Sequence, residues 1–299
     1  MIFSNKNSKE AAKTHSVNKI KEDRRFILNS KSGFYLREAY KTLRTNVNFA
    51  LADTEGCKLI LVTSAMQSEG KSLTALNLAI SLGQTDSKVL IIDCDLRRPK
   101  LNRLLNVSTT SGLSNLLMDS SRMDVTIATH ESHGIDLLLS GDIPPNPSEL
   151  LASVRMQKLL DALKDRYDYI IIDSPPVDMV IDAVVLAPQC DGVLFVVKAD
   201  QSERGAVMHA VDQLQYAKAK ILGFVFNGMS PESGIGYGKY RYRQYGRYGR
   251  YGKYGRYGYS KYGYSKYGYG QYGYGQYGYG YQSHVSESSP ATAETQMKP

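Results

Sequence analysis

The sequence has no tryptophan, three cysteines and no long apolar run. Cys57, Cys94 and Cys190 are widely spaced and form no CxxC pair, so neither a disulfide framework nor a zinc site is predicted. Apolar runs such as Ile170–Ile172 are far shorter than the roughly 20 residues of a membrane-spanning helix. The polar N-terminus also lacks the apolar core of a signal peptide. These absences predict a cytoplasmic protein whose association with a membrane must come through a partner.

Acidic residues are missing from residues 234–285, where nine lysines and arginines lie. Subtracting those nine charges from the net charge of +8 leaves the rest of the chain near −1. The basic character therefore belongs to one C-terminal region, and the body of the protein is not predicted to bind polyanions. No nucleic-acid partner is expected.

Composition divides the chain into four segments. They are a polar leader expected to be flexible (1–32), an N-terminal helix (33–54), a globular body (55–230) and a low-complexity tail (231–299). In the second segment, Leu36, Tyr40, Leu43 and Val47 recur at helical spacing, which predicts an amphipathic helix. The length of the body suits one α/β domain.

Short β-branched runs alternate with helix-length segments through the body. Strands are predicted at 59–63, 89–92, 135–139, 169–172, 193–197 and 221–226, and helices at 71–82, 148–164 and 203–217. Strands that are apolar throughout and separated by helices indicate a doubly wound, mostly parallel sheet with both faces covered. Ligands of such sheets bind beyond the carboxyl ends of the strands, so the residues that follow strands carry the functional argument.

The first predicted strand runs into Ser64–Ser72 and then into a helix, as in a phosphate-binding P-loop. Ala65 replaces the first glycine of the pattern G-x-x-x-x-G-K-[ST], and an ordinary loop before a helix is the alternative interpretation. Backbone N–H groups at the helix N-terminus can hold phosphate oxygens, Lys71 can reach the terminal phosphates and Ser72 can bind Mg²⁺. Nucleotide contacts are expected from Ser68, Glu69, Gly70, Lys71, Ser72, Leu73 and Asn227.

Carboxylates follow two further predicted strands. Asp93 and Asp95 come at the end of one strand, and Asp173 ends another. Loop acids that cap a helix are the alternative for the first pair. Because all these motifs lie at strand ends of one domain, the sequence predicts binding of ATP and Mg²⁺, with Ser72, Asp95 and Asp173 as the metal-binding residues.

Together these motifs resemble the deviant P-loop ATPases with a P-loop NTPase-like fold. Within that class, the D-x-D-x-R segment Asp93–Arg97, the stretch Gly141–Leu151 and the stretch Glu38–Asn46 are similar to bacterial tyrosine kinases. The resemblance covers about residues 33–230. It implies an ATP-dependent protein-tyrosine kinase that autophosphorylates its C-terminal tyrosines between subunits and regulates capsular or extracellular polysaccharide synthesis and export. It also implies Lys71, Asp93, Asp95 and Asp173 as catalytic residues, with Asp93 as the first candidate for the base and Asp95 as the second.

The chain departs from this family at two places. Glu38, Lys41 and Arg44 stand where the family's oligomerisation motif is E-x-x-R-x-x-R, and lysine lacks the bidentate fork of arginine. Ser68 stands where the family has a glycine, and other residues of the loop are expected to supply the backbone geometry. Asn227 is expected to read the adenine edge or to form a turn.

The tail contains 18 of the 23 tyrosines, interleaved with glycine. With little to bury, it is predicted to be disordered and to supply the phosphate acceptors. Stacking on single-stranded nucleic acid and self-association are the alternatives. The expected acceptors are Tyr237, Tyr240, Tyr242, Tyr245, Tyr248, Tyr251, Tyr254, Tyr257, Tyr259, Tyr262, Tyr264, Tyr267, Tyr269, Tyr272, Tyr274, Tyr277, Tyr279 and Tyr281.

The resemblance also implies partners: a transmembrane activator that acts as a polysaccharide co-polymerase, further copies of the chain in a ring, and an opposing tyrosine phosphatase. A partitioning-type ATPase would share the body, but such proteins carry a signature lysine early in the phosphate loop, and Met66–Ser68 offers none. A nucleic-acid-binding protein would use the tail alone.

Overall fold

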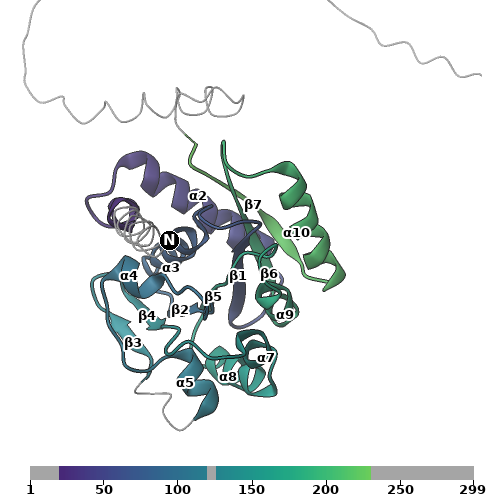
Figure 1. Ribbon diagram of the computed structural model, residues 1–299. Helices are drawn as coiled ribbons and strands as arrows, with labels where there is room; N and C mark the ends of the chain where they lie inside the picture. Colours follow the sequence, from purple (N-terminus) through teal and green to yellow (C-terminus); the bar gives the residue numbers. More distant parts are fainter. Residues whose placement is uncertain (1–19, 120–125, 230–299) are drawn as a thin grey trace, which may run out of the picture. The chain divides into compact units, whose positions relative to one another are not determined.

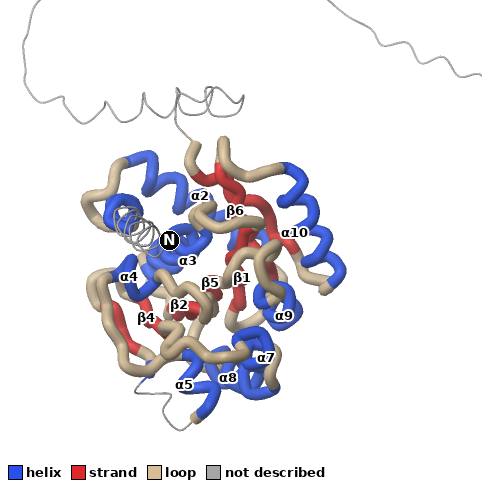
Figure 2. The backbone as a smooth tube through the Cα atoms, in the orientation of Figure 1, coloured by secondary structure: helices blue, strands red, loops and turns tan. Residues whose placement is uncertain are grey.

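The computed structural model describes residues 20–119 and 126–229, so the predicted tail and all its tyrosines lie outside the described residues. A seven-stranded sheet with the order β3-β4-β2-β5-β1-β6-β7 crosses the centre (Figures 1 and 2). The strands are β1 Lys58–Ser64, β2 Val89–Asp93, β3 Ala128–His130, β4 Ile135–Leu138, β5 Tyr169–Asp173, β6 Gly192–Lys198 and β7 Ile221–Asn227. Every pairing is parallel except that of β3 with β4. The six predicted strands and the parallel α/β fold are confirmed, whereas the short edge strand β3 was not predicted.

Two apolar clusters cover the two faces of the sheet. In β1, Leu59 and Leu61 belong to one cluster, and Ile60 and Val62 to the other, because successive side chains point to opposite faces. The helices contributing to the first cluster are α5 Leu113–Met118, α7 Pro147–Leu151, α8 Val154–Lys164, α9 Asp182–Leu186 and α10 Arg204–Tyr216. Those contributing to the second are α2 Phe34–Ala50, α3 Lys71–Gly83 and α4 Leu101–Leu105.

The helix predicted over 148–164 is wrong as a single element. The chain forms α7 and then α8, and Ser153 between them adopts an extended backbone. Its Oγ accepts a hydrogen bond from the Met156 N–H at 3.2 Å, which is the standard N-cap arrangement. Apolar spacing continues across the break, so periodicity alone concealed it.

The predicted flexible leader is also wrong at its C-terminal end. Ile27 and Leu28 are buried in the same cluster as α3. The Asn77 side chain of α3 accepts the Leu28 N–H at 2.8 Å and donates to the Phe26 carbonyl at 2.8 Å. A short 3₁₀ turn, Arg24–Phe26, precedes this contact. The folded body therefore includes residues well before residue 33.

The amphipathic helix predicted in segment 33–54 is confirmed as α2. Val47 is fully buried, while Leu36, Tyr40 and Leu43 are partly buried against the same cluster. This face of α2 packs on α3. None of the helices in the described part of the chain has the length and apolarity that crossing a membrane requires.

Candidate functional site

The predicted acidic residues meet at the carboxyl edge of the sheet. Asp93 in β2 pairs in register with Asp173 in β5, and Asp173 pairs with Val62 in β1. Residues in register on parallel strands project from the same face. Ile91 and Ile171, two positions earlier, belong to the cluster that α3 covers, so both carboxylates lie on that face. The N-terminus of α3 lies at the same edge, because this helix begins at Lys71, whose ammonium approaches Asp173.

Lys71 lies at the centre of this group. Its Nζ is 3.2 Å from Asp95 Oδ2, 3.8 Å from Asp173 Oδ1 and 3.4 Å from Ser72 Oγ. Burial of the ammonium favours its neutral form, but the carboxylates of Asp173, Asp95 and Asp93 outweigh burial and raise the pKa of Lys71. The fold thus brings together four residues that the sequence analysis singled out: Lys71, Ser72, Asp95 and Asp173. Lys71 and Asp173 are 102 residues apart in the sequence.

Asp173 is the least satisfied polar group of the site. Its carboxylate is fully buried, and neither oxygen makes a hydrogen bond with any described residue. Burial raises the pKa of Asp173, against the lowering effect of Lys71. If all were ionised, the three carboxylates and one ammonium would carry a net charge of −2, which suits a hydrated divalent cation. Together with the buried Ser72 hydroxyl, these residues fit a Mg²⁺ site.

Asp93 and Asp95 differ in what they contact. The two oxygens of Asp93 accept the backbone N–H groups of Asp95 at 3.1 Å and Leu101 at 3.2 Å. Burial, followed by the nearby Asp173 and Asp95, raises the pKa of Asp93 to about 8. Asp95 accepts the Arg98 N–H at 2.9 Å through Oδ1 and directs Oδ2 to Lys71. Asp93 thus shapes the turn, and Asp95 reaches the lysine.

The phosphate loop has left-handed backbone at Ser68 (φ 69°) and at Gly70 (φ 98°). The expectation that other residues would supply this geometry in place of Ser68 is therefore wrong, because Ser68 adopts it itself. The side chain of Glu69 is buried and braces the loop, and contact of Glu69 with nucleotide stays a prediction. Glu69 accepts the Met66 N–H at 2.8 Å through one oxygen and the Ser202 hydroxyl through the other.

Asn227, at the end of β7, holds the same loop. Its Nδ2 donates to the Glu69 carbonyl at 2.9 Å, and its Oδ1 accepts the Gly228 N–H at 2.8 Å. A Cβ added to Gly70 would lie 1.8 Å from Asn227 Nδ2, so glycine is required for this close approach. Contact of Asn227 with adenine remains a prediction. Leu73, another predicted nucleotide contact, lies partly buried against the second apolar cluster, to which α3 contributes.

A second polar network, which the sequence did not indicate, anchors the acidic turn. Arg97 donates to Asp182 through Nε at 2.9 Å and through Nη2 at 3.2 Å, and donates to Ser148 Oγ at 2.8 Å. Ser148 Oγ donates in turn to Asp182 Oδ1 at 2.6 Å. Asp182 is fully buried at the start of α9, and its bonding raises the pKa of Arg97. The network ties the D-x-D-x-R segment to α7 and α9.

The predicted oligomerisation residues lie on α2. Lys41 Nζ is 2.8 Å from Glu38 Oε1 in an exposed ion pair within the helix. Arg44 instead donates through Nη1 to the Ser81 carbonyl of α3. Two of the three residues thus remain available on the surface, and their role in assembly stays a prediction.

Comparison with known proteins agrees with these motifs. The family described as AAA domain matches residues 57–223. The chain is 40% identical over 204 residues to tyrosine-protein kinase YwqD of Bacillus subtilis, a match that covers 68% of this chain and 85% of that protein. It also superimposes on the kinase domain of Escherichia coli tyrosine kinase ETK with a TM-score of 0.64 and 35% identity, covering 68% of this chain and 79% of that one.

A more distant neighbour shares the fold alone. The septum site-determining protein MinD of Pyrococcus horikoshii, solved with Mg-ADP, has a TM-score of 0.50 and 23% identity, covering 58% of this chain and 72% of that one. The P-loop ATPase-like fold supports nucleotide and magnesium binding. The kinase relatives exceed this neighbour in both identity and coverage. This chain therefore belongs to the family of bacterial tyrosine-protein kinases.

Proposed function

We propose that the chain transfers the γ-phosphoryl group of ATP to tyrosine hydroxyls of its own tail, Tyr237–Tyr281. The observation that carries the proposal is the contact of Lys71 with Asp95 and Asp173 at the end of a phosphate loop. Family membership and the dense tyrosine array on the same chain support it. The tail lies outside the described residues, so its approach to the site is part of the proposal.

In the proposed reaction the bond between the γ-phosphorus and the bridging oxygen of ADP breaks, and a bond to the tyrosine oxygen forms. Lys71 and the loop N–H groups stabilise the charge that develops on the phosphoryl oxygens. Bound Mg²⁺, held by Ser72, Asp95 and Asp173, would neutralise phosphate charge. The contribution of the chain is to hold these groups in a buried site, where their electrostatic effect is strong.

The phenolic proton must pass to a base, because tyrosine has a pKa near 10. Asp93 is the first candidate by family resemblance, and burial, which raises its pKa, makes its ionised carboxylate a stronger proton acceptor. Asp95 is the second candidate, and unlike Asp93 it is slightly exposed. Asp93→Asn and Asp95→Asn should both lose activity. Loss of tail phosphorylation with intact nucleotide affinity would identify the base.

The decisive experiment is incubation of the full chain with ATP and Mg²⁺, followed by phosphotyrosine detection. Lys71→Met should abolish tail phosphorylation. Because this change leaves three buried carboxylates without their cation, the melting temperature must be measured alongside. Ser72→Ala leaves the lysine in place and should also reduce activity. Lys158→Met, on the exposed face of α8, is the matched control. Undiminished phosphotyrosine in a folded Lys71→Met protein would refute the proposal.

We further propose that the reaction occurs between copies in a ring and is stimulated at the inner face of the membrane by a transmembrane activator. Regulation of capsular or extracellular polysaccharide synthesis, opposed by a phosphatase, completes this proposal. Family membership and the exposed pair Glu38–Lys41 support it. The triple change of Glu38, Lys41 and Arg44 to alanine should leave a monomer under native mass spectrometry. An unchanged assembly would exclude that role for α2.

A further inference from the structure

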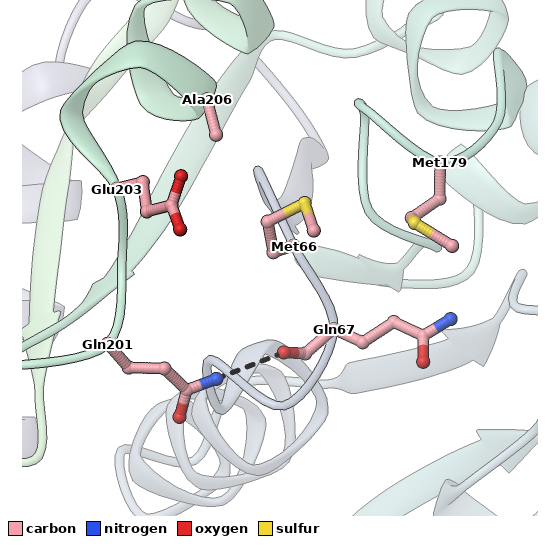
Figure 3. A pocket seen from close by; sticks show the side chains of 6 residues that line it. All are labelled: Met66, Gln67, Met179, Gln201, Glu203 and Ala206. Atoms are coloured by element: carbon pink, nitrogen blue, oxygen red, sulfur yellow. Dashed lines mark hydrogen bonds between the residues drawn. The ribbon is translucent and has the colours of Figure 1, made fainter.

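A cavity of about 330 Å³ lies beside the phosphate loop (Figure 3). Three segments form it: the phosphate loop, the loop after β5 and the start of α10. Its lining consists of Met66, Gln67, Met179, Gln201, Glu203 and Ala206. Such a volume is at the lower end of the range for small-ligand sites, and it can hold one large side chain.

Contacts connect the cavity to the candidate site. The Gln201 side chain donates to the Gln67 carbonyl at 3.2 Å, as the dashed line in Figure 3 shows. The Gln67 side chain accepts from Arg98 at 3.1 Å, and the Arg98 N–H is bonded to Asp95. The cavity therefore lies against the part of the loop that adjoins the acidic turn. The contacts run on from Asp95 to Lys71, whose Nζ lies 3.2 Å from Asp95 Oδ2, and so link the cavity to the candidate site.

The chemistry of the lining is unusual for a surface. Met66 and Met179 are 41% and 49% exposed, and their thioethers favour contact with aromatic rings. Glu203 carries the only charge among the six lining residues. It is exposed at the N-terminus of α10, and its carboxylate has no hydrogen bond or ion pair within the described residues. The lining thus offers two sulfur atoms to a ring and one unpaired anion to a cation.

We propose that this cavity is the acceptor-docking site for the basic part of the tail, Lys239–Lys266, and that it favours tyrosines flanked by lysine or arginine. The proposal rests on the proposed function. In that segment tyrosine, glycine and a basic residue alternate, so a ring between the methionines would place a cation near Glu203. The intervening glycines let the backbone approach the loop closely. Beyond Lys266 the tail continues with Tyr, Gly and Gln but without charge up to Tyr281.

The tail itself supplies matched probes. Residues 245–257 and residues 267–279 are both 13-residue Tyr-Gly peptides, the first with four basic residues and the second with none. At low salt, fluorescently labelled 245–257 should bind the full-length protein about two- to fivefold more tightly than 267–279, as expected for one exposed ion pair. The protein's own tail competes with both peptides, so the ratio of the two affinities is the measurement.

Variants separate the two parts of the proposal. Glu203→Gln should remove the preference for the basic peptide, whereas Asp212→Asn, another exposed acid on α10, should keep it. Met179→Ala should weaken the binding of both peptides several-fold. Met208→Ala should not, because Met208 is an exposed residue of α10 outside the lining. With ATP, Met179→Ala should raise KM for both peptides, Glu203→Gln should raise KM for the basic peptide alone, and kcat should be unchanged in both variants.

The outcomes distinguish this inference from the proposed function. If the wild-type protein phosphorylates its tail but binds both peptides equally, or if Glu203→Gln keeps the preference, the docking site is wrong and the kinase function stands. If no phosphotyrosine forms on the tail, the proposed function fails, and the affinity ratio still tests the cavity. Equal loss of affinity in Met208→Ala and Met179→Ala would also overturn the proposal.

Discussion

Removing Arg97 should cost more stability than removing Asp182, although the two residues share the same bonds. The reason is their unequal exposure: the Asp182 side chain is 0% exposed, whereas that of Arg97 is 38% exposed. Without Arg97, the buried carboxylate keeps only the Ser148 hydroxyl. An uncompensated buried charge of this kind costs roughly 3–5 kcal/mol. Without Asp182, the guanidinium can turn into water, and the loss should be about 1–2 kcal/mol.

Urea unfolding of Arg97→Ala, Asp182→Ala and the double variant tests this reasoning. The double variant should be roughly 2 kcal/mol more stable than Arg97→Ala, because it contains no unpaired buried charge. Arg98→Ala is the control, since among the described residues the exposed Arg98 side chain bonds only to Gln67, and its loss should change stability by less than about 0.5 kcal/mol.

The same variants separate positioning from stability. At a temperature where all are folded, Arg97→Lys keeps the positive charge but loses the two-pronged contact that holds the Asp93–Arg97 turn to α9. Arg97→Lys should therefore lower kcat and change the KM for ATP little. The reasoning is refuted if Asp182→Ala destabilises the protein as much as Arg97→Ala, because exposure would then not govern the energetics.

Three further predictions follow from local geometry. Ser68→Gly should raise the free energy of unfolding by about 0.5–1 kcal/mol in urea, because glycine adopts the left-handed backbone at φ 69° without strain. Gly112→Ala should destabilise the protein by about 1–3 kcal/mol, because the added Cβ would lie 2.2 Å from the Gly141 nitrogen. Gly205→Ala, in open space on α10, is the control and should not destabilise it. Similar melting temperatures for the two variants would contradict this prediction. Cys94, whose burial raises the pKa of its thiol well above the usual value, should react with iodoacetamide only after unfolding; modification of the native protein would disprove it.

Local signals explain why the core of the site was predictable. The phosphate loop follows β1 and the acidic residues lie at the ends of β2 and β5, and parallel strands place their carboxyl ends at one edge. Lys71 and Asp173 could therefore be brought together from sequence spacing alone. The order of the sheet then set the details, such as the register of Asp93 with Asp173.

The parts that sequence reasoning missed depend on contacts without a local pattern. Asp182 lies 85 residues from Arg97 in a short helix with no motif, so nothing in the sequence marks it as a partner. Ser68 was missed for the opposite reason: residue type argues against a left-handed backbone, and the surrounding loop overrides that preference. The break between α7 and α8, where Ser153 caps the start of α8, was missed because the apolar spacing continues across it.

The bond between Asn227 and the phosphate loop bears on the access of external substrate proteins to the candidate site. The tail follows directly from β7, so its first tyrosine, Tyr237, is tethered ten residues from a residue that contacts the loop. Ten residues span at most about 35 Å when extended. Tethering on that scale corresponds to an effective concentration in the millimolar range. If the tail is the acceptor, whether in its own copy or in a neighbouring copy of a ring, its tyrosines compete locally with external proteins, and we expect a freely diffusing substrate to gain access chiefly after the tail has been modified.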